Sequence, residues 1–306
     1  MKTKKIAPLL ILAVIWGSYY VASQQTVKQM SVFTTGIVIR FITMILLFFI
    51  MWKKDELKKL LTVKGVLGRL LLIGVLGFLL DLTAFIGLSL SPAGAGTALL
   101  KCDIIFVNLI SVIIYKRKFT KWDWLFSLVM LFGVFMVLNV DFANFHFNIG
   151  YIFFILSALF VSINAFVIKS AQLDKNNPQP DDVVAFYNNF VTMILFTVTA
   201  CIMGTIGDLA KLGSSGTLVL SACLAGLGQT GIYLVYYYNL RHFPVWIVKV
   251  FLLFMPIVAA LISFLLFGEK LGTTQYLGVA VVLLGAFGIL RMQQRTGSSG
   301  EAFSGR

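Results

Sequence analysis

The sequence predicts an all-α integral membrane protein of ten transmembrane helices, arranged as two inverted repeats of five helices. Three observations lead to this fold: runs of about 20 apolar residues, an uneven distribution of basic residues between alternate loops, and an internal similarity between the two halves of the chain. The composition agrees, because 59% of the residues are apolar and only 12% are charged. In a soluble protein about 25% of residues are charged.

Ten apolar runs are separated by polar residues, glycine or proline. Each is close to the 20 or so residues that a helix needs to cross ~30 Å of hydrocarbon. The predicted helices span residues 6–23, 32–52, 68–90, 93–115, 122–140, 149–169, 182–205, 215–240, 244–267 and 273–291. The seventh is the least apolar, because Tyr187, Asn188 and Asn189 lie near its start.

Basic residues predict the orientation of the chain. With the first helix starting in the cytoplasm, the inside loops and both termini hold 19 of the 25 Lys and Arg residues, and the outside loops hold three. This distribution follows the positive-inside rule and predicts a multi-pass protein of the cytoplasmic membrane with both termini in the cytoplasm. The expected partners are the lipid bilayer and a small-molecule substrate. No nucleic-acid partner is expected, and the chain is predicted to be a monomer or a homodimer.

The two halves of the chain are similar at a nearly constant offset. Residues 40–46 match residues 189–195 at an offset of 149, and further matches at 152 are Phe85 with Tyr237, Pro92 with Pro244, and Gly133 with Gly285. Because five is an odd number, the second repeat enters the membrane upside down, as in transporters that work by alternating access. The predicted division is a first repeat at 1–143, a second at 144–295, and a disordered tail or a sequence added by cloning at 296–306.

Three segments resemble a known family. They are IWGSYYVAS at 15–23, FPVWIVKVFLLFMPIVAALISFLLFGEKL at 243–271 and LGVAVVLLGAFGIL at 277–290. The chain resembles an EamA-type transporter of the drug/metabolite transporter superfamily, most specifically at Pro256 and Glu269. The resemblance implies a secondary transporter of small metabolites. In the first repeat Ile104 and Arg117 take the two specific positions, and the stretch Lys101-Cys102-Asp103 replaces ordinarily apolar residues.

Five ionisable residues lie inside the predicted helices, namely Arg40, Asp81, Lys101, Asp103 and Lys249. A charge at the bilayer centre costs at least ~2.5 kcal/mol, so these side chains face protein or water. The first four are expected to cluster, with Arg40 bridging one or both carboxylates. The charges of all five residues, three positive and two negative, leave one surplus positive charge. Either a bound carboxylate or phosphate neutralises it, or Lys249 loses its proton or extends its ammonium to the inner interface. The five residues either form structural ion pairs or line a substrate pathway.

The predicted substrate site combines these charges with deep polar and aromatic residues. Its members are Tyr20, Arg40, Asp81, Lys101, Asp103, Asn164, Gln229, Tyr237 and Lys249. Asp103 is the first candidate for proton coupling and Asp81 the second, because a carboxylate at the midplane is the simplest proton acceptor. Further aromatic residues predicted to wall a cavity are Trp16, Tyr19, Tyr233 and Tyr236.

Export or exchange of an amino acid or a similar amphoteric compound is the predicted function. Its carboxylate would meet Arg40 or Lys101, and its ammonium would meet Asp81 or Asp103. Export of organic cations is the first alternative, favoured if the aromatic wall dominates and Arg40 is fully paired. A membrane scaffold that transports nothing is the second.

An enzyme is not expected. The sequence contains neither GxxxxGK[ST] nor GxSxG, and its two histidines, His146 and His242, fall in predicted loops. No cofactor and no metal ion are expected.

Overall fold

The computed structural model describes residues 6–90, 99–114, 116, 120–137, 149–213, 215–255, 257–258 and 272–296. Within these ranges every regular element is a helix. The long helices are α1 (Ala7–Val27), α2 (Val32–Lys53), α3 (Leu67–Leu90), α7 (Ile149–Gln172), α8 (Asp181–Ile202) and α9 (Gly216–His242). The others are α5 (Asp103–Ile113), α6 (Lys121–Val137), α10 (Val245–Leu252), α12 (Thr273–Thr296) and the 3₁₀ helices η2 (Leu57–Leu61) and η3 (Ile206–Gly213).

The long helices confirm a membrane-spanning, all-helical chain. Six helices in the described residues, α1, α2, α3, α7, α8 and α9, are long and apolar enough to cross a membrane. The shorter α5 and α10 lie within two of the four other predicted spans, and α6 and α12 overlap the remaining two. The total of ten spans remains a prediction.

Several predicted helix ends are displaced by local contacts. The first helix runs to Val27, four residues past its predicted end. There the hydroxyl of the buried Thr26 donates to the Ser221 hydroxyl of α9 at 3.1 Å. Conversely, α8 ends at Ile202 rather than residue 205, because Gly204 adopts a φ of +67°, a conformation that terminates helices.

Two helices predicted to be continuous are interrupted. Residues 101–102 and 253–254 form turns in the predicted spans 93–115 and 244–267. The backbone tightens at both places: Cys102 N–H donates to the Leu99 carbonyl at 3.0 Å, and Leu253 N–H donates to the Val250 carbonyl at 3.1 Å. These i to i−3 bonds replace the α-helical i to i−4 pattern. The two turns are 152 residues apart, the offset that relates the two halves of the sequence.

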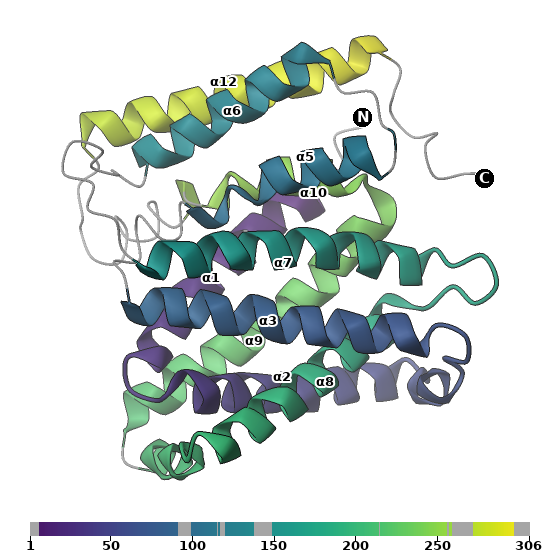
Figure 1. Ribbon diagram of the computed structural model, residues 1–306, viewed down its shortest axis with the longest axis vertical. Coiled ribbons are helices and arrows are strands. Elements are labelled where there is room, and N and C mark those ends of the chain that lie inside the picture. The colour runs from purple at the N-terminus through teal and green to yellow at the C-terminus, as the bar shows by residue number, and fades with distance from the viewer. Residues whose placement is uncertain are drawn as a thin grey trace.

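The helix packing repeats the similarity between the halves (Figure 1). Helix α1 of the first half packs on α9 of the second half, and the corresponding helices α7 and α3 also pack together. Equivalent helices also meet each other, in the pairs α2 with α8, α5 with α10, and α6 with α12. The α6–α12 pair forms a separate layer at one side of the bundle, whereas the other helices enclose the centre.

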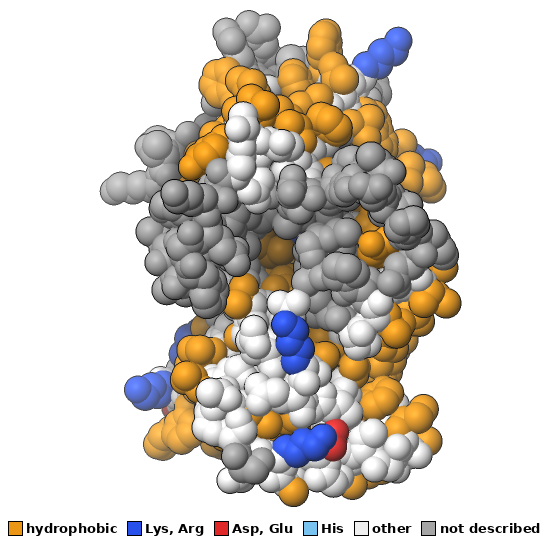
Figure 2. Space-filling view, turned by 90° about the vertical axis from the view of Figure 1, so that its left-hand side faces the viewer, with side chains coloured by type: hydrophobic (Ala, Val, Ile, Leu, Met, Phe, Trp, Pro, Cys, Tyr) orange, Lys and Arg blue, Asp and Glu red, His pale blue; other side chains and the backbone are white. Residues whose placement is uncertain are grey.

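Polar contacts concentrate at one end of the bundle, where the α2–α3 and α7–α8 connections meet. The Asn177 side-chain amide donates to the Thr62 carbonyl at 2.8 Å, and Arg241 pairs with Asp181 at 2.7 Å. At the opposite end the Ser31 N–H donates to Asp208 at 2.9 Å. Figure 2 views that opposite end, where apolar side chains cover the flanks and charged groups are sparse among the described residues in view.

Asp174 organises the α7–α8 connection. Its carboxylate accepts the N–H groups of Asn177 at 2.9 Å and Asn176 at 3.0 Å, and it pairs with Arg69 at 2.6 Å. The Asn177 N–H, followed by the Arg69 guanidinium, lowers the pKa of the Asp174 carboxyl below its ordinary value of 3.8. The contacts therefore stabilise the loop fully above that ordinary value, and their contribution is lost as the pH falls through the lowered pKa.

We expect Asp174→Asn to speed hydrogen exchange at the amides of Asn176 and Asn177 at neutral pH, where the wild-type carboxylate is ionised. In the wild type, exchange corrected for its intrinsic pH dependence should accelerate only below pH ~4. Hydrogen-exchange mass spectrometry of the 170–180 peptide measures both effects. Equal protection of wild type and variant at pH 7 would contradict the assignment.

Candidate functional site

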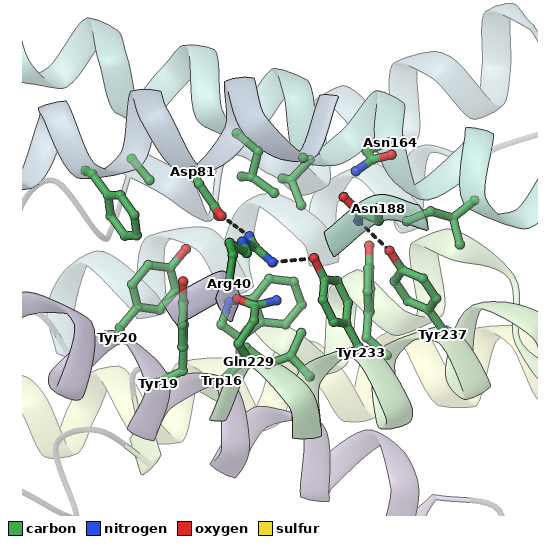
Figure 3. A pocket seen from close by; sticks show the side chains of 18 residues that line it. Trp16, Tyr19, Tyr20, Arg40, Asp81, Asn164, Asn188, Gln229, Tyr233 and Tyr237 are labelled. Carbon is green, nitrogen blue, oxygen red and sulfur yellow. Dashed lines mark hydrogen bonds and ion pairs between the residues drawn. The ribbon is translucent and has the colours of Figure 1, made fainter. Parts of the chain in front are cut away.

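A cavity lies in the centre of the bundle, between α1, α3, α7 and α9 (Figure 3). Arg40 of α2 and Asn188 of α8 complete its wall. The volume that the centres of water molecules can occupy in this cavity is about 40 Å³. A single water needs about 10–15 Å³ of such volume. In this conformation the cavity therefore has room for a few waters, and a larger molecule requires the helices to separate. The lining residues are Trp16, Tyr19, Tyr20, Arg40, Gly77, Leu80, Asp81, Ala84, Phe85, Val161, Asn164, Ile168, Asn188, Gln229, Ile232, Tyr233, Tyr236 and Tyr237.

The two opposing walls of the cavity come from equivalent positions of the two halves. Each of the five lining residues of α3 has a lining residue of α9 at an offset of 152. The equivalent pairs are Gly77 with Gln229, Leu80 with Ile232, Asp81 with Tyr233, Ala84 with Tyr236, and Phe85 with Tyr237. The cavity thus lies between the repeats, but its two walls differ in chemistry. The α3 wall carries small residues and a carboxylate, whereas the α9 wall carries three tyrosines.

The position of Arg40 follows from the two faces of α2. Arg40 and Thr43 lie on the buried face with Gly36 and Leu47, at spacings of three and four residues. The other face exposes large apolar side chains, which suits contact with lipid: Phe41, Ile45, Phe48, Phe49 and Trp52. Because α2 presents its polar residues inward only, Arg40 points into the bundle.

Arg40 is fully engaged by its neighbours. Its guanidinium forms an ion pair with Asp81 and donates a hydrogen bond to the Tyr233 hydroxyl. Its Nη1 lies 3.5 Å from the Asn189 side-chain oxygen, and the Asn189 amide donates to the Arg40 carbonyl at 2.9 Å. Asn189 is the repeat equivalent of Arg40, and Asp81 is the equivalent of Tyr233. The contacts of Arg40 therefore join equivalent residues of the two halves.

Seven of the 18 lining residues are aromatic, among them Trp16 and the tyrosines of α1 and α9 that the sequence predicted to wall a cavity. Trp16 contacts Tyr236 edge to face at a centroid distance of 5.1 Å, and Tyr233 contacts Tyr237 at 5.4 Å. The Asn188 side-chain amide donates to the Tyr237 hydroxyl at 2.5 Å. The rings are thus held in fixed orientations, which suits recognition by stacking or by cation–π attraction.

Two polar groups of the cavity wall are available to a ligand. Asn164 is 3% exposed, and its side-chain oxygen has no hydrogen-bond partner within the described ranges. Asp81 retains 11% exposure of its side chain although it is paired with Arg40, whose side chain is only 3% exposed. A molecule in the cavity therefore meets the Asp81 carboxylate more readily than the guanidinium.

Asp103 pairs with Lys249, and not with Arg40 as the sequence analysis allowed. The Lys249 Nζ lies 2.9 Å from Asp103 Oδ2, although the contact lacks the angle of a hydrogen bond, since the Lys249 Nζ makes none with the described residues. The expectation that Lys249 extends to the interface is wrong, because its side chain is 0% exposed. Asp103 supplies the counter-charge for Lys249. The ring centroids of Tyr236 and Trp16 lie 5.4 and 5.8 Å from the Lys249 Nζ.

The structure divides the predicted site residues into two groups. Six of them line the cavity: Tyr20, Arg40, Asp81, Asn164, Gln229 and Tyr237. The other three, Lys101, Asp103 and Lys249, lie outside its lining, at the facing helices α5 and α10. The predicted site did not include the apolar α3 residues Leu80, Ala84 and Phe85, although the offset of 152 relates them to Ile232, Tyr236 and Tyr237 of α9. The family-specific Pro256 and Glu269 lie outside the described residues.

Comparison with known proteins identifies the family. A family model described as the EamA-like transporter family matches residues 4–139 and again residues 148–291. The chain therefore belongs to the EamA-like transporter family, in agreement with the resemblance seen in its sequence. It is a transporter of the drug/metabolite type, and its helices place it in a membrane.

Solved structures share the fold. One crystal structure of a protein has a TM-score of 0.78 with 15% sequence identity, over 97% of this chain and 100% of its own. At that identity the likeness concerns the fold alone. No curated protein matches the sequence. Among the described residues, no three His, Cys, Asp or Glu side chains are grouped so as to hold a metal ion.

Proposed function

We propose that this chain is a secondary transporter that exports a small organic molecule through the cavity between α1, α3, α7 and α9. The position of the cavity carries the proposal, because equivalent residues of the two repeats line its opposing walls. Transporters built from inverted repeats bind their substrates at such an interface, and exchange of the two repeat conformations opens it to either side in turn.

We propose an organic cation, or an amine that carries an aromatic ring, as the substrate. Seven aromatic residues line the cavity, Arg40 is paired with Asp81, and the carboxylate is more exposed than the guanidinium. Cation–π attraction contributes about 0.5–2 kcal/mol per ring, and more as water is excluded. An ammonium group between the rings would also approach Asp81 and the free side-chain oxygen of Asn164.

An amino acid is the second candidate, and the Arg40–Asp81 pair favours it. A substrate carboxylate that displaced Asp81 from Arg40 would free that carboxylate to accept a proton or to bind the substrate ammonium. This exchange couples binding to protonation within one cavity. It places the proposed coupling at Asp81 rather than at Asp103, which lies outside the cavity lining.

Transport into proteoliposomes tests the substrate proposal. We expect labelled organic cations to be taken up with a higher kcat/KM than labelled amino acids, and Tyr20→Leu to raise the KM for cations about two- to thirtyfold, the equivalent of one cation–π contact. Tyr276→Leu is the matched control, because Tyr276 lies on α12 and is 59% exposed.

Three outcomes separate the candidates. Uptake of amino acids alone would replace the cation proposal by the second candidate. An equal KM change in both tyrosine variants would show that the cavity ring does not bind the substrate. If a folded protein moved neither class, the scaffold alternative would gain.

A further inference from the structure

A second group of buried charges lies outside the cavity. It consists of Lys101 and Asp103, at the turn before α5, and Lys249 of the facing α10, and we call it the α5–α10 charge cluster. Their exposed fractions are 5%, 5% and 0%. Two cations and one carboxylate leave one positive charge in surroundings where an uncompensated charge is costly. The Arg40–Asp81 pair is neutral by itself, so the surplus charge among the five ionisable residues belongs to this cluster.

Lys101 carries the surplus. Asp103 pairs with Lys249 at 2.9 Å, whereas Lys101 makes no ion pair with any carboxylate of the described residues. Its only hydrogen-bond contact in those residues is with Met255 Sδ at 3.5 Å. A thioether is a weak acceptor, and an ammonium has three donors to satisfy. The charges of both Asp103 and Lys249 act on Lys101, so the three groups form one electrostatic unit.

Other groups of the cluster have unused hydrogen-bonding capacity. Asp103 Oδ1 and Lys249 Nζ make no hydrogen bond in the described part of the chain, although both atoms are buried and the two side chains form an ion pair. The Tyr236 hydroxyl, next to Lys249, is buried and likewise makes no hydrogen bond with the described residues. Two ammonium groups and a hydroxyl therefore offer donors, and more donors than acceptors remain. That imbalance is characteristic of an anion site.

The helices are interrupted at the cluster. The turns at 101–102 and 253–254 interrupt equivalent helices of the two repeats, and α5 begins at Asp103 directly after the first turn. Membrane transporters use such interrupted helices to bind ions, because the interruption frees polar backbone groups and exposes helix ends. The N-terminus of an eleven-residue helix also favours negative charge.

We propose that the α5–α10 charge cluster binds a small monovalent anion, a halide or a small carboxylate, held between Lys101 and Lys249 beside the Asp103 carboxylate. One negative charge neutralises the cluster, and the ammonium groups and the Tyr236 hydroxyl supply the hydrogen bonds. The site is distinct from the central cavity. Because the Trp16–Tyr236 contact separates the two, a bound anion would support the aromatic wall from behind without touching the substrate.

Thermal unfolding of the purified full-length protein tests the site. At constant ionic strength, we expect chloride to raise the Tm above that in gluconate, with a saturable dependence on chloride concentration. Formate and acetate show which anions the site accepts. If they raise the Tm as well, the site binds small monovalent anions in general. If chloride alone raises the Tm, the site is specific for halides.

Two variants with opposite expectations make the test specific. Lys101→Met removes the surplus charge and should abolish the dependence on chloride, whereas Asp103→Asn doubles the surplus and should strengthen it. Lys28→Met, at an exposed lysine, is the control and should respond like wild type. If Lys101→Met does not fold, Asp103→Asn and an anomalous bromide peak beside Lys101 in crystals decide.

An equal Tm of the wild type in chloride, formate and gluconate would overturn the proposal, and would indicate that Lys101 is neutral in the folded protein. Retention of the full chloride effect in Lys101→Met would also overturn it. Neither result would bear on transport through the central cavity, whose residues are unchanged in these variants.

Discussion

Arg40→Gln is expected to lower the free energy of unfolding by about 3–5 kcal/mol, the usual cost of leaving one partner of a buried ion pair without its counter-charge. The Arg40 and Asp81 side chains are only 3% and 11% exposed. The substitution also removes a donor from the Tyr233 hydroxyl and from Asn189. The double variant Arg40→Gln/Asp81→Asn should recover much of the loss, because both charges are then absent.

Reversible unfolding in mixed micelles, with the four members of this double-mutant cycle, measures the coupling. Arg69→Gln provides the matched control. Arg69 also pairs with an aspartate, Asp174, but its side chain is 43% exposed, so its loss should cost only about 0–1 kcal/mol. If Arg40→Gln lowered the free energy of unfolding no more than Arg69→Gln does, the buried Arg40–Asp81 pair would contribute no more to stability than an exposed pair.

The fold was predictable because its main determinants are local in the sequence. Apolar runs of membrane-spanning length predicted the helices, and the long ones, α1 to α3 and α7 to α9, lie close to their predicted ranges. The turns at 101–102 and 253–254 were missed, because both stretches remain apolar enough to continue a helix. The signal for the first turn was Lys101-Cys102-Asp103 itself, since two charges within three residues of an apolar run are costly in an unbroken lipid-facing helix. The second turn, at Leu253 and Phe254, has no such signal.

The pairing of charges was only partly predictable, because it depends on helix rotation. Composition and depth indicated that Arg40 would meet a carboxylate, and it pairs with Asp81. The same reasoning allowed Asp103 beside Arg40 and, as one alternative, Lys249 at the interface, whereas Asp103 and Lys249 pair with each other. Helices α5 and α10 belong to different repeats. Contacts between repeats follow from the pseudo-symmetry of the packing, which the position of a single residue along its own helix does not reveal.

The offset of 152 was the most informative sequence feature for the cavity. In the sequence alone it connects Phe85 with Tyr237. Applied to the other two α9 tyrosines of the cavity wall, it identifies Asp81 through Tyr233 and Ala84 through Tyr236, and all of these residues line the cavity. An internal repeat therefore specifies a central site better than the hydropathy of either helix alone, because residues near the pseudo-twofold axis face their own equivalents.

Asp81→Asn is expected to abolish the response of transport to a pH gradient, while uptake driven by the substrate gradient alone persists. The asparagine keeps an oxygen that accepts from Arg40, but it has no proton to exchange. Asp103→Asn should leave the response to the pH gradient in place, because Asp103 lies outside the cavity lining and pairs with Lys249. The measurement is uptake into proteoliposomes with and without an imposed gradient, at equal amounts of folded protein for each variant.

The two aspartates give this experiment a clear contrast. Coupling at Asp81 requires that substrate and proton compete within one cavity, so the variant should also change the KM for the substrate. Coupling at Asp103 would instead require that the state of the α5–α10 charge cluster be transmitted through the Trp16–Tyr236 contact. Loss of the pH response in Asp103→Asn with retention in Asp81→Asn would therefore reverse the proposed assignment. Because the Asp103→Asn variant is also predicted to show a stronger dependence on chloride, the same protein would then link the anion site to transport.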